Sequence, residues 1–393
     1  MSRATSKIGP IGQVVIQSTS LCNLNCSYCY LTVSERQSNH QFPIENVPTV
    51  FGNLMKSDYA LNRLNILFHA GEPLAAGIDY YRRFLAELDT LKIQLGKPDF
   101  EFEFCIQTNA TLITQEWCDF VQEKNIRIGV SCDGPAIIHD ATRKNWAGAG
   151  TLNAVLKGMS LLKKNTIPFS VLSVVSPLTL NYAKEFIGFF VENNIRSIGI
   201  LPLDQLGIQK DNPLGDENLK RKYTEFLKIL LAEIEKNKLD LKIRECDIVL
   251  EAILHQDNHY WDNTPLALIT IDHQGNFSTF SPDMLTNSIP DYEDGNLVLG
   301  NLLEENIDDV IHKPKFKRMW AEIQGGIEKC RQSCDYFQVC GGGLPSVKIN
   351  QHNTFDVAET TDCVYRIKLV ADVMMEKLLD TPVGAAILAE GQA

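Results

Sequence analysis

Short apolar runs alternate with amphipathic stretches through the first half of the chain. Six runs have the length and apolar content of buried β-strands, and they cover residues 14–17, 65–68, 100–106, 126–131, 169–175 and 197–201. Between them, apolar residues recur with helical spacing over residues 78–95, 115–123, 152–164 and 182–193. Strands that alternate with helices predict parallel βαβ units. The fold is therefore expected to be α/β, with functional residues at the carboxyl ends of the strands.

The pattern changes after the sixth predicted strand. A polar loop and an amphipathic helix are predicted over residues 211–238, and a second helix over residues 245–255. Residues 268–277 predict a β-hairpin whose turn contains Gln274 and Gly275. A chain of 393 residues is long enough for two domains. We expect a large α/β domain, a bridging helical segment and a smaller C-terminal domain, at residues 10–235, 236–262 and 263–380.

Charge and hydropathy restrict the class of protein further. The chain has 37 Lys and Arg against 49 Asp and Glu, a net charge of −12. This balance argues against non-specific nucleic-acid binding, because there is no excess of cations to displace counterions. No apolar run reaches the roughly 18 residues of a membrane span, and residues 1–20 lack the apolar core of a secretory signal. We expect a cytoplasmic protein with no nucleic-acid or membrane partner, in which clustered cysteines are metal ligands or catalytic groups rather than disulfides.

Seven of the eleven cysteines fall into two groups. Cys22, Cys26 and Cys29 form a C-x3-C-x2-C motif directly after the first predicted strand. A structural zinc site normally has four protein ligands, whereas three thiolates on a cubane iron-sulfur cluster leave one iron open. An open iron is a place where a substrate or cofactor can bind.

The second group lies near the C-terminus and consists of four cysteines, Cys330, Cys334, Cys340 and Cys363. Four thiolates are enough for a complete iron-sulfur cluster, but the residue types alone leave a four-cysteine zinc site open as an alternative. The remaining cysteines are isolated in apolar or mixed segments and are expected to be small core residues. These are Cys105, Cys118, Cys132 and Cys246.

The spacing of the first group, with Tyr28 between its second and third cysteines, resembles the signature of the radical S-adenosylmethionine (SAM) superfamily. The resemblance implies a partial (β/α)6 barrel and a [4Fe-4S] cluster on Cys22, Cys26 and Cys29, whose open iron binds SAM. It also implies cleavage of SAM to methionine and a 5′-deoxyadenosyl radical, which abstracts a hydrogen atom. In such enzymes the cofactor supplies the chemistry and the protein supplies binding and orientation.

The stretch His-Ala-Gly-Glu-Pro-Leu follows the second predicted strand and resembles the Gly-Gly-Glu-Pro element of this superfamily, with Ala70 in place of the first glycine. The resemblance implies that Gly71 and Glu72 contact the methionyl ammonium of SAM. A glycine, a carboxylate and a proline at a strand end also form a turn that fixes the direction of the glutamate. Taken alone, the tripeptide is equally typical of an ordinary strand-to-helix turn.

Two later strand ends, Gln-Thr-Asn and Ser-Cys-Asp-Gly-Pro, resemble those of the radical SAM enzymes that modify peptides and proteins. This resemblance makes Gln107, Ser131 and Arg143 candidates for contacts to the methionyl carboxylate and ribose, and Tyr28 a candidate for the adenine. The alternative is that these polar residues form loop turns, which they favour in any protein. Tyr28 also suits a packing role in the cysteine loop.

The C-terminal cysteines and the hairpin resemble a SPASM extension, which usually binds two auxiliary [4Fe-4S] clusters through seven cysteines. Here Phe280 occupies the position of an expected cysteine, and Leu344 lies near another such position. The ligands of one cluster are therefore missing together. The resemblance implies a reduced, SPASM/twitch-like domain with one auxiliary [4Fe-4S] cluster, bound by Cys330, Cys334, Cys340 and Cys363.

Resemblance to two groups within the superfamily suggests two possible functions for this chain. In the anaerobic sulfatase maturases, which form formylglycine, an aspartate acts as base where this chain has Ser281. The absence of that base counts against sulfatase maturation, and Asp283 is a candidate to replace it. The His-Ala-Gly-Glu-Pro-Leu and Cys-Gly-Gly-Gly-Leu-Pro stretches and the reduced cysteine set look more like cyclophane-forming maturases of glycine-rich repeat peptides. That resemblance implies a ribosomal precursor peptide as substrate, a carbon-carbon crosslink to an aromatic residue, and a flavodoxin or ferredoxin as electron donor.

Two alternatives remain open. One is a different peptide oxidation in the same superfamily, either formylglycine or thioether formation. The other is a non-catalytic iron-sulfur or zinc protein, but this predicts four ligands at each site, whereas the N-terminal motif offers three.

Overall fold

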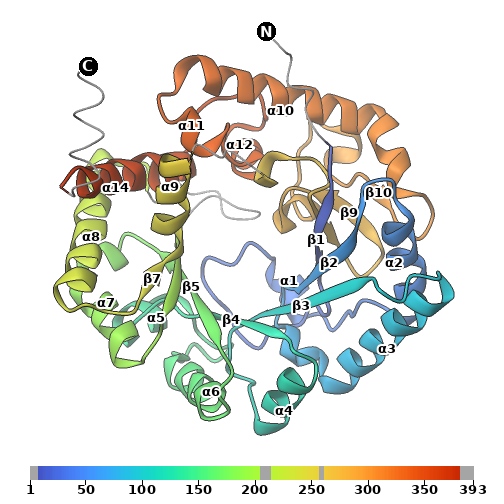
Figure 1. Ribbon diagram of the computed structural model, residues 1–393, viewed down its shortest axis with the longest axis horizontal. Helices are drawn as coiled ribbons and strands as arrows, with labels where there is room; N and C mark the ends of the chain where they lie inside the picture. Colours follow the sequence, from blue (N-terminus) through green and yellow to red (C-terminus); the bar gives the residue numbers. More distant parts are fainter. Residues whose placement is uncertain (1–7, 204–213, 256–260, 381–393) are drawn as a thin grey trace.

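The computed structural model describes residues 8–203, 214–255 and 261–380 (Figure 1). Within these residues the strands form one sheet in the order β10-β9-β8-β1-β2-β3-β4-β5-β6-β7. The strands are Ile11–Ile16 (β1), Ala60–Phe68 (β2), Glu101–Thr108 (β3), Arg127–Ser131 (β4), Phe169–Val175 (β5), Ser197–Pro202 (β6), Lys242–Ile243 (β7), Leu268–Ile271 (β8), Asn276–Thr279 (β9) and Gly300–Asn301 (β10).

The strands from β1 to β7 pair in parallel, each with the next along the chain. Each of the strands from β1 to β6 contributes fully buried apolar residues to the core, namely Val14, Ile66, Ile106, Val130, Val171 and Ile200. The expected α/β architecture is confirmed. Because the strands are parallel, the carboxyl ends of β1 to β6 lie along the same edge of the sheet.

The helices that connect the strands form an outer layer around the sheet (Figure 1). Strand β5 and helices α4 and α6 have the predicted bounds, and the other predicted strands and helices differ from the observed ones by a few residues at their ends. The helices of the outer layer are Val47–Lys56 (α2), Ile78–Gln94 (α3), Gln115–Glu123 (α4), Ala136–Thr142 (α5), Leu152–Lys164 (α6), Ala183–Glu192 (α7) and Glu217–Lys236 (α8), and the short helix Val33–Gln37 (α1) lies inside this layer in Figure 1. Residues 211–213 of the predicted polar loop lie outside the described residues.

The predicted hairpin is confirmed, since β8 and β9 pair in an antiparallel manner with Ile269 opposite Thr279. It also extends the sheet of the first half of the chain, because β8 pairs in parallel with the outer edge of β1, where Val14 lies opposite Ile269. The C-terminal hairpin therefore belongs to the same sheet as β1, the strand that leads into the cysteine loop.

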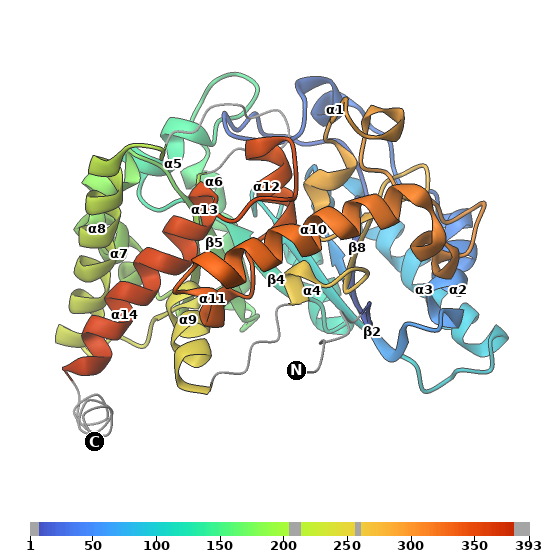
Figure 2. The same ribbon diagram turned by 90° about the horizontal axis from the view of Figure 1, so that it is seen from above.

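Helices cover the remaining side of the molecule. The long helix α10 runs from the side of α2 to α11, near α9, and α14 packs against α8 and α9 (Figures 1 and 2). These helices are Arg244–His255 (α9), Pro314–Ser333 (α10), Phe337–Cys340 (α11), Pro345–His352 (α12), Thr361–Cys363 (α13) and Leu369–Leu379 (α14). Residues 256–260 of the expected bridging segment lie outside the described residues. In the described parts of the chain, no helix has the length and apolar character needed to cross a membrane.

Candidate active site at the carboxyl ends of the strands

The cysteine loop follows β1 and carries three partly buried thiols, Cys22, Cys26 and Cys29. Burial raises the pKa of Cys22 to about 12, with smaller contributions from charge repulsion by the other two thiols. Among the described residues, no group of three or more His, Cys, Asp or Glu side chains forms a site for a metal ion. A cubane cluster is wider than one ion and takes each ligand on a separate iron, so three neighbouring thiols fit such a cluster and leave one iron open.

A strap formed by residues 142–150 holds the cysteine loop in place. The indole nitrogen of Trp146 donates to the carbonyl oxygen of Cys22 over 2.8 Å. The backbone nitrogen of Asn25 donates to the carbonyl oxygen of Lys144 over 2.7 Å. Because these bonds satisfy backbone groups of the loop, the thiols are presented from a fixed backbone. The sequence motifs gave no indication of this contact.

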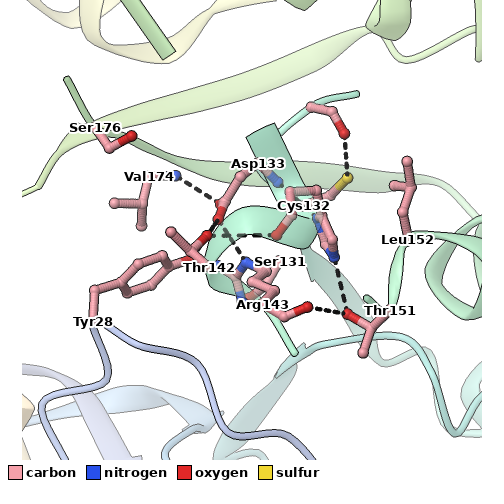
Figure 3. A network of polar contacts seen from close by, with 12 residues as sticks. Tyr28, Ser131, Cys132, Asp133, Thr142, Arg143, Thr151, Leu152, Val174 and Ser176 are labelled. Carbon is pink, nitrogen blue, oxygen red and sulfur yellow. Dashed lines mark hydrogen bonds and ion pairs between the residues drawn. The ribbon is translucent and has the colours of Figure 1, made fainter. Parts of the chain in front are cut away.

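Asp133 joins the cysteine loop to the loop after β4 (Figure 3). Its Oδ2 accepts hydrogen bonds from Tyr28 Oη at 2.5 Å and from Arg143 Nε at 3.0 Å, and its Oδ1 accepts one from the backbone nitrogen of Val174 at 3.0 Å. The side chains of Asp133 and Arg143 are 1% and 10% exposed. One buried carboxylate thus positions two of the residues that the sequence suggested for SAM contacts. The role of Asp133 itself was missed, although it lies within the quoted Ser-Cys-Asp-Gly-Pro stretch.

The Gly-Glu-Pro turn lies directly against the cysteine loop. Gly71 has φ +66°, and a Cβ at this position would lie 2.3 Å from the carbonyl oxygen of Thr19, so only glycine fits there. The carboxylate of Glu72 is buried and accepts hydrogen bonds from Thr108 Oγ1 at 2.6 Å, from the backbone nitrogen of Asn109 at 2.8 Å and from that of Leu74 at 3.0 Å. A carboxylate has about four acceptor positions, so one remains for a further donor such as an ammonium.

Gln107 and Ser131 lie together at the ends of β3 and β4. The amide nitrogen of Gln107 donates to Ser131 Oγ over 2.9 Å. A Cβ at Gly129 would lie 2.1 Å from the amide oxygen of Gln107, so the glycine on β4 leaves room for this side chain. The two residues form one polar unit between the Gly-Glu-Pro turn and the pair of Tyr28 and Arg143.

A cavity of about 220 Å³ lies beside the cysteine loop, at the carboxyl ends of β1, β2 and β8. Two of its wall residues, Tyr30 and Thr270, have buried hydroxyl groups that find no hydrogen-bond partner among the described residues. Burial lowers the pKa of a third wall residue, His69, to about 4, so its imidazole is neutral at physiological pH. The polar residues that line the cavity are Gln17, Tyr30, Glu35, His69, Thr270, Asp272, His273, Gln274 and Thr286. Unpartnered buried hydroxyl groups are costly, so the cavity is suited to a ligand with polar atoms.

The cysteines of the second group surround the turn after α11. Three successive glycines follow Cys340 with positive φ, and a Cβ at Gly342 would lie 2.8 Å from the side chain of Ile327. The backbone nitrogens of Gly342 and Gly343 bond to the sulfur of Cys340, and the backbone nitrogen of Thr360 bonds to that of Cys363 at 3.5 Å. These backbone donors on Cys340 and Cys363 fit anionic thiolate ligands, whereas the sulfur of Cys330 faces the carbonyl oxygens of Gly342 and Ala358. The four thiols likewise do not form a site for one metal ion within the described residues.

Asp283 lies on the turn after β9 and is 2% exposed. Its carboxylate accepts hydrogen bonds from Asn350 at 2.8 Å, Asn287 at 3.3 Å and the hydroxyl of Ser281. The neighbouring residues Pro282, Leu285 and Thr286 line the cavity, whereas Asp283 does not. Protein donors thus fill three of its about four acceptor positions.

The isolated cysteines lie mainly in the core. Cys118, Cys132 and Cys246 are buried and Cys105 is partly buried.

Comparison with known proteins agrees with this geometry. Residues 16–190 match the model of the radical SAM superfamily. The protein sll1766 of Synechocystis sp. is 34% identical over 375 residues, which cover 95% of this chain and 93% of that protein. The serine-type anaerobic sulfatase-maturating enzyme of Bacteroides thetaiotaomicron is 25% identical and the cysteine-type enzyme of Clostridium perfringens 27% identical, over 87% and 85% of this chain and 84% and 88% of theirs.

Solved structures share the fold. The structure of anSMEcpe with bound AdoMet superposes with a TM-score of 0.75 at 21% identity and covers 95% of this chain and 98% of that one. Streptococcus suis SuiB bound to the precursor peptide SuiA superposes with a TM-score of 0.62 at 15% identity, over 90% and 76% of the two chains. At this level of identity the similarity shows the architecture alone.

The chain belongs to the radical SAM superfamily, and it is a radical SAM enzyme. Membership implies a [4Fe-4S] cluster and SAM as cofactors, and the three thiols after β1 fit that cluster.

Proposed function

We propose that the enzyme is a maturase of a ribosomal precursor peptide and that it installs a carbon-carbon crosslink between a side-chain carbon and an aromatic ring. The observation that carries the proposal is the cavity beside the cysteine loop, because Tyr30 on its wall is adjacent to Cys29. A residue held there lies next to the site of radical formation. Structures of fold relatives hold peptides, since anSMEcpe was solved with the Cp18Cys peptide and SuiB with the precursor peptide SuiA.

The cavity favours one kind of side chain. Its volume of about 220 Å³ is enough for one ring-bearing side chain, and its wall contains Glu35 and Asp272 but no Lys or Arg. An acidic peptide residue would meet like charge there, whereas a neutral aromatic residue would not. A polar atom on its ring would satisfy the hydroxyl groups of Tyr30 and Thr270 once binding uncovers them. This preference supports an aromatic residue as one partner of the crosslink.

The proposed cofactor site uses the residues at the strand ends. When bound together, the cluster and SAM supply a 5′-deoxyadenosyl radical that removes one hydrogen atom from the peptide. The buried carboxylate of Asp133 orients Tyr28 for the adenine and Arg143 for the ribose or carboxylate. Glu72 keeps one acceptor position for the methionyl ammonium, next to Gly71, while Gln107 and Ser131 provide polar groups between these two contacts. The thiols that we assign to the cluster are Cys22, Cys26 and Cys29.

The peptide chemistry then needs an electron acceptor. The carbon radical adds to an aromatic ring carbon, and the adduct must lose one electron and one proton to restore the aromatic ring, so the peptide loses two hydrogen atoms in total. Cys330, Cys334, Cys340 and Cys363 would hold an auxiliary [4Fe-4S] cluster, which would supply the electron acceptor, and the proton would pass to solvent. A flavodoxin or ferredoxin is the proposed donor for the first cluster.

Formylglycine formation is the second candidate, because sulfatase-maturating enzymes of both types align with most of this chain. That reaction needs a base near the oxidised residue. Asp283 is the nearest candidate by sequence, but its carboxylate is buried and accepts bonds from Asn287, Asn350 and Ser281. Because Asp283 also does not line the cavity, this arrangement favours the crosslinking reaction. Thioether formation would also require a cysteine in the peptide.

The test is anaerobic reaction of the reconstituted enzyme with the candidate precursor peptide, followed by mass spectrometry. We expect the loss of two hydrogen atoms, mapped by fragmentation to an aromatic residue and resistant to alkylation, reduction and hydroxylamine. A product that reacts with hydroxylamine is an aldehyde and would support formylglycine formation instead. Zinc in place of iron, or no 5′-deoxyadenosine with dithionite, would exclude the radical mechanism.

A further inference from the structure

A lysine is buried among the C-terminal cysteines. Lys348 on α12 is 3% exposed, and its Nζ donates to the sulfur of Cys330 over 3.7 Å. The side chains of Cys340 and Cys363 also lie within electrostatic range of this ammonium. Among the described residues, no carboxylate forms an ion pair with Lys348, and the sulfur is its one hydrogen-bond partner.

The surrounding backbone leaves space for this side chain. A Cβ at Gly326 on α10 would lie 3.0 Å from Lys348 Nζ, and a Cβ at Gly343 would lie 3.6 Å from its Cε. Two glycines from separate segments therefore border the lysine. By contrast, Lys368 near the same cysteines pairs with Glu359, so much of its charge is neutralised by that carboxylate.

A buried ammonium without a carboxylate is unfavourable. Its removal from water costs several kcal/mol unless an opposite charge compensates for it. The sulfur atoms supply this charge only when they are thiolates, which is their state in a bound cluster. The burial of Lys348 thus indicates that the site is built for an anionic group.

We propose that Lys348 raises the reduction potential of the auxiliary cluster and so suits it to accept an electron from the peptide. This inference rests on the auxiliary cluster of the proposed function. A one-electron reduction makes the cluster more negative by one charge, and a nearby cation stabilises the reduced form more than the oxidised one. A hydrogen bond to a ligand sulfur acts in the same direction. Lys348 therefore acts through the positive charge that it places beside the cluster, and the proposal gives it no contact with the peptide.

The test compares reduction potentials in the Cys26→Ala background, in which the auxiliary cluster is the source of the iron signal. Potentials are measured by redox titration followed by electron paramagnetic resonance. At a fixed potential, we expect Lys348→Met to lower the ratio of reduced to oxidised cluster at least tenfold, which is 59 mV for a one-electron couple. Lys348→Arg keeps the charge and should stay close to the parent protein.

Lys315→Met is the matched control. Lys315 is a second buried lysine, on α10, but its Nζ donates to Asn296 Oδ1 over 2.9 Å instead of to a cysteine. Its replacement should leave the potential unchanged. A second readout is the stability of the cluster-free protein, in which Lys348→Met should unfold at a higher denaturant concentration, because it removes an uncompensated cation.

The outcomes separate the two proposals. If the C-terminal site binds iron but Lys348→Met and the parent protein have the same reduction potential, this inference is wrong. The proposal of an auxiliary cluster would still stand. Equal shifts in Lys348→Met and Lys315→Met would overturn it as well. Absence of a cluster at the C-terminal site would overturn the auxiliary cluster itself, and with it the role of Lys348.

Discussion

Tyr28 Oη lies 2.5 Å from Oδ2 of Asp133, and this contact joins the loop that carries the three cysteines to the loop after β4. The same oxygen accepts a bond from the buried Arg143. This carboxylate therefore joins two loops that the sequence places far apart, in addition to the bonds that residues 142–150 make to the cysteine loop. The consequences of its removal can be measured separately for stability and for cofactor cleavage.

We expect Asp133→Ala to lower the free energy of unfolding by about 3–5 kcal/mol, because it leaves the guanidinium of Arg143 buried without its partner. SAM cleavage should fall as well, since Tyr28 loses its anchor. The control is Glu103→Ala, which removes an exposed ion pair with Arg127 and should cost about 1 kcal/mol or less. Chemical denaturation of both variants checks this, and equal losses would contradict the assigned role of Asp133.

Gly71→Ala should be far more harmful than Gly77→Ala, although both glycines have positive φ. At Gly77 no atom lies within 4 Å of the added Cβ, so the cost is backbone strain of about 1 kcal/mol. At Gly71 the Cβ would collide with the carbonyl oxygen of Thr19, which moves the cysteine loop. We expect Gly71→Ala alone to lose iron from the N-terminal site, as measured by iron content per chain in a variant that lacks the C-terminal cysteines.

Stability should depend on pH through His139, which is fully buried between the backbone nitrogen of Asp133 and Thr151 Oγ1. Burial, with a smaller effect of Arg143, lowers the pKa of His139 to about 4. The folded protein therefore keeps this imidazole neutral while the unfolded chain, with a pKa of about 6.5, binds a proton. The free energy of unfolding should fall as the pH drops from about 6.5 towards about 4, by at most about 3 kcal/mol.

Denaturation of the cluster-free protein at several pH values measures this slope. His139→Gln removes the titrating group, so the difference between parent and variant isolates its contribution from that of the carboxylates. A constant difference across this pH range would show that His139 is not responsible.

Tyr30→Phe should reduce kcat/KM for the peptide about 3- to 10-fold, the value of one hydrogen bond of about 0.5–1.5 kcal/mol. Cleavage of SAM without peptide should continue. Thr270→Val is expected to behave in the same way. Tyr223→Phe is a close control, because the buried hydroxyl of Tyr223 also has no partner in the described part of the chain, but Tyr223 lies in the core against Tyr365. An equal loss in Tyr223→Phe would show that the effect of Tyr30 does not come from the cavity.

Much of the fold is encoded in local patterns. The strand over 169–175 and the helices over 115–123 and 152–164 were predicted with their observed bounds, because apolar spacing directly reflects which face is buried. The pairing of β8 with β1 was not predicted. A strand pattern predicts that a segment pairs with another strand, but it does not identify which strand, least of all one so distant in the sequence.

The candidate site shows the same limit. Cysteine spacing and the Gly-Glu-Pro turn are local, and the residues that they suggested lie at the carboxyl ends of neighbouring strands. Asp133 and Lys348 were missed, since each acts through side chains from other elements, and Thr270 was missed because the fold alone places it on the cavity wall. A buried lysine on a short helix resembles any surface lysine until the fold places α12 against Cys330.

The parallel pairing of β8 with β1 has a consequence for biosynthesis. The outer edge of β1 stays unpaired until residues 268–271 leave the ribosome, although β1 carries the cysteine loop at its end. Non-local pairing of this kind forms late, and an open strand edge invites association with other chains in the meantime. We therefore expect the sheet to close last beside the N-terminal cysteines. If iron and sulfide were delivered before β8 pairs with β1, the site would lack the wall that β8 forms. Cluster assembly should therefore follow synthesis of the whole chain.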